Sequence, residues 1–279
     1  MIYLNYLVID KLIKNSLIED INYGDVTTDN LFCGQEISKG KFIAKENGIV
    51  AGIEVAERVF QILDKSIVFE KYLKDGHEVK KGDTIAYIEG SSSNILKGER
   101  VALNIMQRMC GIATKTFKIV QLVKGYNVKI VDTRKTLPGF RILDKYSVRM
   151  GGGYNHRMNL SDFVMIKDNH IKAAGSIKEA VERVKSNIPF TTKIEVEVEN
   201  FDQLQEALDA KVDVIMLDNM DINHMRKAVE FVDKRVLLEA SGNVNEDNVE
   251  HIASTGVDII SMGSLTHSVR ALDISLKFQ

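Results

Sequence analysis

The feature that most constrains this chain is a regular alternation of short apolar runs and amphipathic segments, which begins near residue 127. The runs are rich in β-branched residues and cover 127–133, 162–169, 193–200, 212–219, 235–243 and 257–264. Segments with helical spacing lie between the later runs, at 176–187, 201–210, 222–234 and 245–255. Strands that alternate with helices of this length predict βαβ units and a parallel sheet, and thus an α/β fold.

The repeat length favours a barrel. The last four units recur at roughly twenty to twenty-five residues, which is typical of a (β/α) barrel. A doubly wound sheet is the alternative at the level of the fold. Because only six strands are recognisable in the sequence, we expect an incomplete barrel, and we assign it to residues 111–265.

Residues 1–110 follow a different pattern and are expected to form an α+β domain. Apolar runs at 40–52 and 67–91 contain turn-forming residues, which is typical of strands joined by tight turns. A helical segment at 97–109 then leads into the barrel. The tail, 266–279, lies beyond the last barrel strand, and we expect it to return to the first domain.

The N-terminus reads as an amphipathic helix whose apolar face would contain Leu4, Leu7, Val8, Leu12 and Ile13. It lacks the long apolar core and the small-residue cleavage site of a signal peptide. For the segment 19–29 we expect a structural role, in which Asp25 and the threonine pair that follows act as turn and cap residues.

Charged and small polar residues follow the apolar runs, at the end of a parallel barrel where functional side chains gather. Cations follow the first two runs, carboxylates lie in or after the middle runs, and Gly/Ser pairs follow the last two. These residues are Arg134, Lys135, Lys167, Glu195, Glu197, Glu199, Asp218, Glu239, Ser241, Gly242, Gly263 and Ser264. A glycine-rich turn at 151–153 also precedes His156 and Arg157. Seven Lys or Arg therefore fall between residues 134 and 167.

This pattern of charge predicts a polyanionic ligand. Arginine presents a planar fork that suits carboxylate or phosphate, and lysine supplies a compact cation. Carboxylates beside such a ligand imply a divalent cation, because Mg²⁺ is usually held by one or two carboxylates together with ligand phosphates. Gly/Ser loops after the last strands are a common phosphate site. The residues therefore indicate a Mg²⁺-dependent enzyme that acts on a phosphorylated sugar and a carboxylated molecule.

Each of these features also has a simpler interpretation. Lysine and arginine runs are usually solvated, and we prefer that interpretation for Arg141, Lys145 and Arg149. His156 is equally consistent with a structural hydrogen-bonding role and with a site role. The alternating glutamates at 195–199 would fit a strand with one charged face. In a barrel, however, one face points into the core, so at least one of them needs a cation or hydrogen-bonding partners.

Composition excludes several classes of function. The formal net charge is −2, and no series of aromatic residues accompanies the cations, so we expect no nucleic-acid partner. No apolar stretch is long enough to span a bilayer, so we expect no membrane association. The two cysteines, Cys33 and Cys110, have no metal-ligand spacing and predict no disulfide scaffold, which fits a reducing cytoplasm.

Two segments together resemble the signature of the quinolinate phosphoribosyltransferase family. They are DTRKTLPGFR at 132–141 and KYSVRMGGGYNHRMNLSDFVMIKDNHI at 145–171. The similarity extends from 19–29 through GERVALNIMQRMCGIAT, IEVEVEN, IMLDN and LEASGN to the closing segment at 257–278. It thus spans nearly the whole chain in one order.

The resemblance implies an N-terminal α/β sandwich and a C-terminal incomplete α/β barrel. It also implies transfer of phosphoribosyl from phosphoribosyl pyrophosphate to quinolinate, with loss of CO₂, in the de novo route to NAD. The cofactor would be Mg²⁺, and the functional unit would be a homodimer or hexamer with a shared active site.

The resemblance further implies a role for each site residue. Arg134, His156 and Arg157 would bind the quinolinate carboxylates, and Arg100 would reach in from a neighbouring subunit. Lys135 and Lys167 would lie between the substrates, and Glu197 and Asp218 would face Mg²⁺–pyrophosphate and the ribose. Ser241, Gly242 and Gly263 would bind the 5′-phosphate. The catalytic residues would be Lys135, Lys167, Glu197 and Asp218. One departure is Asn243, where many relatives have a further glycine.

Two rival functions remain open. A related pyrophosphorylase-like enzyme could use the same fold on a different base or acid, and dependence on quinolinate would separate the two. A non-catalytic anion sensor could be built on the same barrel. The presence of both Glu197 and Asp218 argues against a sensor, which needs no metal-supported leaving group.

Overall fold

The computed structural model describes residues 4–279, and within them the chain divides into two compact units. The first comprises the chain up to Phe117 with Thr136–Gly152 and Leu265–Gln279. The second comprises Lys118–Lys135 and Gly153–Ser264. The long helix α4 (Ser92–Leu122) contains the boundary at Phe117, as well as residue 110.

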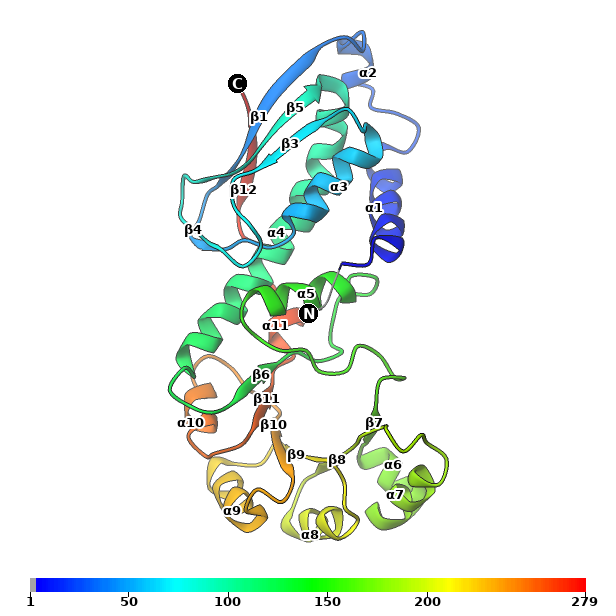
Figure 1. The fold of residues 1–279 in the computed structure, drawn as a ribbon, viewed down its shortest axis with the longest axis vertical. Coiled ribbons are helices and arrows are strands. Elements are labelled where there is room, and N and C mark those ends of the chain that lie inside the picture. Colours follow the sequence, from blue (N-terminus) through cyan, green and yellow to red (C-terminus); the bar gives the residue numbers. More distant parts are fainter. Residues whose placement is uncertain (1–3) are drawn as a thin grey trace. The chain divides into compact units, whose positions relative to one another are not determined.

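The first unit is built on a four-stranded antiparallel sheet with the strand order β12-β1-β5-β3 (Figure 1). The strands are β1 (Ile37–Ala44), β3 (Val68–Lys71), β5 (Thr84–Ser91) and β12 (Ile274–Phe278), and β2 (Gly48–Ile49) pairs separately with β4 (Glu78–Val79). Its helices are α1 (Tyr6–Ile21), α2 (Thr28–Leu31), α3 (Ile53–Leu63), the first part of α4, α5 (Arg141–Met150) and most of α11 (Ser264–His267). The tail therefore returns to pair with β1 in the first unit.

The N-terminal helix forms as expected, but its buried face differs from the expected one. Ile9, Ile13 and Leu17 are buried on α1, whereas Leu7 and Val8 are exposed. The buried residues recur four apart, which places them on one helical face. Of the expected residues, Leu4 and Ile13 are buried. In the segment that follows, the Asp25 carboxylate accepts the backbone N–H groups of residues 27 and 28, at 3.1 and 3.0 Å. This is the turn-and-cap geometry expected of the segment 19–29.

The second unit confirms the six-stranded parallel sheet. Its strands are β6 (Lys129–Val131), β7 (Val164–Ile166), β8 (Ile194–Val198), β9 (Val214–Asp218), β10 (Leu237–Ser241) and β11 (Ile259–Ser261). They are ordered β6-β11-β10-β9-β8-β7, so β6 and β7 form the two edges and the barrel stays open. An isolated bridge between Val131 and Tyr154 extends the sheet beyond β6.

Helices connect the strands on the outer side of this curved sheet (Figure 1). They are α6 (Asp168–Ala174), α7 (Ile177–Lys185), α8 (Phe201–Asp209), α9 (Ile222–Val232) and α10 (Val249–Ala253). The N-cap residues Ser176, Asn200 and Asp221 each accept a backbone N–H three residues further on. Such caps fix where each helix begins. Those at Asn200 and Asp221 also fix the length of the loops after β8 and β9.

A repeated aspartate fixes the opposite ends of the strands. Asp213, just before β9, accepts the backbone N–H of Ile194 on β8 at 2.8 Å. Asp258, just before β11, accepts the N–H of Leu238 on β10 at 2.9 Å. Each carboxylate satisfies a donor at the start of a neighbouring strand, which helps to hold adjacent strands in register.

The predicted solvation of Lys145 is wrong. This lysine is fully buried on α5, whereas Arg141 and Arg149 are partly exposed. The buried positions of α5 are Leu143, Asp144, Lys145, Ser147 and Val148, and the other five residues of the helix are partly exposed. Lys145 therefore lies among buried neighbours, which a run of charge in the sequence did not reveal.

In the described residues, no helix combines the length and apolarity needed to cross a bilayer.

Candidate active site

The period of the barrel strands determines which side chains enter the cavity of the second unit. Successive residues of a strand point to opposite faces, so every second residue shares one face. The cavity at the carboxyl ends is lined on this pattern by Met165 and Lys167, Glu197, Met216 and Asp218, Glu239 and Ser241, and Ser261. The intervening residues Val196, Leu217 and Ala240 are fully buried on the other face.

The cavity has a volume of about 590 Å³, and its remaining lining comes from four loops. Thr133, Arg134 and Lys135 follow β6, His156 and Arg157 come from the loop before β7, and Asn219, Gly242 and Asn243 follow β9 and β10. The structure thus brings together nine of the eleven site residues named from the sequence. This size suits a small ligand with several polar anchors.

Positive charge is concentrated at the β6 side of the cavity. Arg157 is only 8% exposed. Burial, and next the neighbouring charge of Arg134, lower the pKa of the Arg157 guanidinium. Two arginines that oppose each other's charge in a partly buried cavity would both be stabilised by a bound anion.

Lys167 and Glu197 form an ion pair across the strand ends of β7 and β8. The Lys167 side chain is 42% exposed and that of Glu197 is 14% exposed, so solvent reaches the lysine. On the next strand, the Asp218 carboxylate accepts a hydrogen bond from the Asn219 side chain at 2.9 Å. The middle of the cavity therefore carries alternating charge, with two carboxylates on adjacent strands.

The loop after β10 makes a tight turn that excludes side chains. Gly242 has a φ of 99°, and a Cβ at this position would lie 2.2 Å from the Oδ1 atom of Asn219. Asn243 also has a positive φ, of 52°, a region that asparagine tolerates better than most residues. The turn therefore has two successive residues with a left-handed backbone, Gly242 and Asn243.

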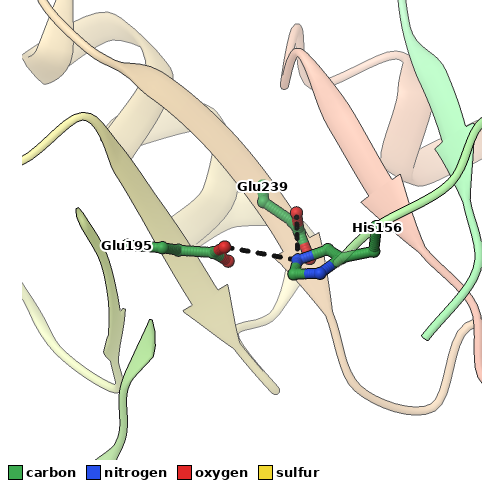
Figure 2. Close-up of side chains that lie close together, drawn as sticks. All are labelled: His156, Glu195 and Glu239. Carbon is green, nitrogen blue, oxygen red and sulfur yellow. Dashed lines mark ion pairs between the residues drawn. The ribbon is translucent and has the colours of Figure 1, made fainter. Parts of the chain in front are cut away.

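His156, Glu195 and Glu239 form a cluster of side chains, and two of them, His156 and Glu239, also line the cavity. His156 Nε2 is 3.2 Å from Glu195 Oε2 and 3.5 Å from Glu239 Oε2 (Figure 2). Burial lowers the pKa of His156, but hydrogen bonds and charge from both glutamates outweigh it and raise it to about 9. Burial raises the pKa of Glu195. At neutral pH the three groups together therefore hold one proton more than a neutral imidazole with two carboxylates would. Their side chains could also bind a metal ion.

Two residues named from the sequence do not line this cavity. Arg100 is exposed on α4 in the first unit, and Gly263 follows β11 without being part of the lining. Conversely, the sequence reasoning did not assign Glu195 or Glu239 to the site. For Glu195 the alternation with Ile194 and Val196 was a signal, because it places the glutamate on the inner face of its strand. Glu239 lies in a run without such alternation and gave no such signal.

Glu197 and Asp218 are the residues that fit a divalent cation. They end adjacent strands, and both line the same cavity next to cationic side chains. Carboxylate oxygens are hard donors of the kind that Mg²⁺ prefers, and a site with only one or two protein ligands leaves room for phosphate oxygens.

The chain is similar to known proteins along nearly its full length. The family model described as Quinolinate phosphoribosyl transferase, N-terminal domain, matches residues 25–110, and the one for the C-terminal domain matches residues 112–277. A probable nicotinate-nucleotide pyrophosphorylase [carboxylating] from Synechocystis is 43% identical over 98% of this chain and 93% of that relative. A quinolinate phosphoribosyltransferase [decarboxylating] from Nicotiana tabacum is 43% identical over 96% of this chain and 81% of that relative.

Solved structures agree with these relatives. The NadC protein from Streptococcus pyogenes superposes with a TM-score of 0.95 at 40% identity, over 99% of both chains. The nicotinate-nucleotide pyrophosphorylase from Francisella tularensis superposes with a TM-score of 0.96 at 39% identity, over 100% of this chain and 98% of that one.

Proposed function

The chain belongs to the quinolinate phosphoribosyltransferase family, and on this premise we propose that the cavity of the second unit is its active site. The enzyme transfers phosphoribosyl from phosphoribosyl pyrophosphate to quinolinate with decarboxylation. The products are nicotinate mononucleotide, pyrophosphate and CO₂, in NAD biosynthesis. The observation that carries the placement is the convergence of Arg134, Arg157, Lys135 and Lys167 on one cavity.

The three regions of the cavity match the three parts of the reaction. Arg134 and Arg157, with His156 beside them, would receive the dicarboxylate, because guanidinium forks pair with carboxylates in two parallel hydrogen bonds. Lys135 and Lys167 would lie between the two substrates.

The other end of the cavity would receive the sugar phosphate. Ser241 and Gly242, together with Gly263 beyond the lining, would bind the 5′-phosphate. The left-handed turn at Gly242 suits this role, because only a backbone without a Cβ can come so close to a ligand.

We propose Mg²⁺ as the cofactor, held near Glu197 and Asp218 indirectly, through water or substrate. When bound, Mg²⁺ would offset negative charge on the pyrophosphate leaving group. The two carboxylates would also stabilise positive charge that develops on the ribose as pyrophosphate departs.

The side chains of the cavity would act chiefly by positioning. The arginines would hold quinolinate so that its ring nitrogen faces the anomeric carbon of the ribose. The nitrogen lone pair forms the new C–N bond while the bond to pyrophosphate oxygen breaks, and lysine charge stabilises the departing oxygens. The ring nitrogen is then cationic. The adjacent C–C bond to the carboxylate breaks, CO₂ leaves, and the electron pair that remains on the ring carbon takes up a proton.

We further propose a cytoplasmic homodimer or hexamer in which Arg100 of one subunit completes the quinolinate end of its neighbour's cavity. The exposed position of Arg100 on α4 leaves its guanidinium available to a second chain. Both described cysteines, Cys33 and Cys110, are free thiols, which fits a reducing compartment.

The placement of the dicarboxylate is tested by replacing Arg134 with alanine and measuring CO₂ release from carboxyl-labelled quinolinate. We expect kcat/KM for quinolinate to fall by about thirtyfold or more, since a charge-assisted hydrogen-bonding pair contributes about 2 kcal/mol. The matched control is Arg226→Ala, an exposed arginine on α9 of the same unit. Wild-type turnover by a folded Arg134→Ala enzyme would contradict the proposal, and turnover of another acid in place of quinolinate would favour the rival enzyme.

A further inference from the structure

Glu195 and Glu239 are buried carboxylates whose place in the protein the reaction above does not explain. They are 2% and 1% exposed, and they lie on β8 and β10, the two strands that flank β9. In the described part of the chain, the Oε1 atom of each carboxylate has no hydrogen-bond partner. Burying two carboxylates is costly unless they are paired, and the group they share is the imidazole of His156.

Both ring nitrogens of His156 are held by the protein. Nε2 faces the two glutamates (Figure 2), and Nδ1 accepts the backbone N–H of Arg157 at 2.8 Å. An Nδ1 that accepts a hydrogen bond carries a lone pair, so the ring proton lies on Nε2. The extra proton that the cluster holds at neutral pH is shared between Nε2 and the two carboxylates, and is not on Nδ1. The carboxylates of Glu195 and Glu239 therefore orient the His156 ring, and the ring in turn orients the peptide N–H of Arg157.

The peptide that His156 orients carries the buried arginine of the cavity. The Arg157 guanidinium lies 5.7 Å from the centre of the Phe163 ring, and the His156 ring lies 5.2 Å from the same ring. The backbone N–H of His156 donates to Asp132, directly after β6, at 3.0 Å. The chain at 156–157 is thus fixed from β6, β8 and β10 together.

We propose that Glu195 and Glu239 are positioning residues for the dicarboxylate substrate: they fix His156, and His156 fixes Arg157 in the cavity. This inference rests on the proposed placement of quinolinate against Arg134 and Arg157. It gives His156, which also lines the cavity, a part in placing Arg157, because its Nδ1 accepts the Arg157 backbone N–H. The free energy that it costs to bury two carboxylates is then offset by the accurate placement of the Arg157 guanidinium.

The kinetic test uses Glu195→Gln and Glu239→Gln, which keep the size of the side chain and remove its charge. Each is expected to raise KM for quinolinate about tenfold while KM for phosphoribosyl pyrophosphate changes less than about twofold, because only the arginine end is disturbed. The matched control is Glu199→Gln, an exposed glutamate just beyond the end of β8, which should leave both constants unchanged. Equal rises in both KM values would indicate a general structural role and would overturn the proposal.

A double-mutant cycle tests whether the glutamates act through His156. In a His156→Ala enzyme the ring is gone, so adding Glu195→Gln should change KM for quinolinate by less than about twofold. A full tenfold effect in that background would show that Glu195 acts by another route. A stoichiometric divalent ion that is present in the purified wild-type protein and lost in Glu195→Gln would also overturn the proposal, since the cluster would then be a metal site.

A spectroscopic measurement separates this inference from the proposed function. With ¹⁵N-labelled histidine, the ring nitrogen shifts of His156 report directly which nitrogen carries the proton, without any turnover. We expect an Nε2-protonated ring in the wild type and a changed spectrum in both glutamine variants. If the wild type fails to release CO₂ from quinolinate but shows this tautomer, the proposed function fails while the positioning network stands. A His156 ring that is protonated at Nδ1 in the wild type would overturn the positioning network.

Discussion

At the scale of single residues, the cavity places like charges close together. Burial, and next the charge of Arg134, lower the pKa of Arg157. The protonated form of Arg157 is therefore destabilised by the neighbouring arginine. A dianionic ligand would reverse that destabilisation, since each carboxylate offers lone pairs to a guanidinium fork. On the proposed placement of quinolinate, the repulsion between the arginines would favour a ligand with two negative groups.

Gly242 offers a sharp test of the sugar-phosphate end. An alanine there would place its Cβ 2.2 Å from Asn219 Oδ1 at a φ of 99°. We expect Gly242→Ala to raise KM for phosphoribosyl pyrophosphate about tenfold, because backbone strain of this kind costs about 1–3 kcal/mol. KM for quinolinate should change little.

The control for this variant is Gly125→Ala, in the turn before β6. No heavy atom lies within 4 Å of a Cβ at Gly125, so steady-state kinetics with that variant should match the wild type. An unchanged KM for phosphoribosyl pyrophosphate in a folded Gly242→Ala enzyme would remove the phosphate from this loop.

The strand-end residues were predictable because their position follows from one rule. A side chain directly after a parallel strand lies at the carboxyl end of the sheet, so Arg134, Lys167 and Asp218 could be placed together without coordinates. The contact between His156 and the glutamates could not. It joins a loop to the inner faces of two strands separated by a third, and no spacing in the sequence encodes that contact.

At the scale of elements, the parallel sheet was predictable and the packing of helices was less so. Six runs with β-branched residues became six strands because their apolar residues are buried on the outer face, under the helices. On α1 and α5 the apolar and charged patterns were ambiguous. Leu7 became exposed and Lys145 buried, since the neighbours that pack on a helix decide which of its faces is covered.

The aspartates that precede β9 and β11 predict a measurable effect on stability. Replacing Asp213 with alanine removes the acceptor for the Ile194 N–H, and should lower the free energy of unfolding by about 1 kcal/mol. Urea denaturation would measure it. Asp213→Asn keeps an acceptor oxygen and should recover most of the loss. An alanine variant as stable as the wild type would show that solvent satisfies this donor equally well.

At the scale of the whole molecule, the active site of one chain is proposed to be incomplete without a second copy. The cavity of the second unit gathers nine of the residues named from the sequence, and the remaining arginine, Arg100, stands on an exposed position of the first unit. A site shared between subunits would explain why Arg100, which we propose to bind the dianion, is missing from the lining of its own cavity.

Mixed assembly decides this point. Arg100→Ala chains lack the donated arginine but keep an intact cavity, and Lys167→Ala chains have a damaged cavity but an intact Arg100. Each variant alone should have little activity. In a mixed dimer, one of the two sites combines the intact cavity with the intact arginine, so up to about half of the sites should recover activity. The measurement is CO₂ release by mixed dimers that are obtained by co-refolding and tag-based purification. Each variant chain lacks one residue that the site needs, so neither chain can recover activity by itself. If verified mixed dimers stay as inactive as their parents, Arg100 serves its own chain and the proposal of a shared site is wrong.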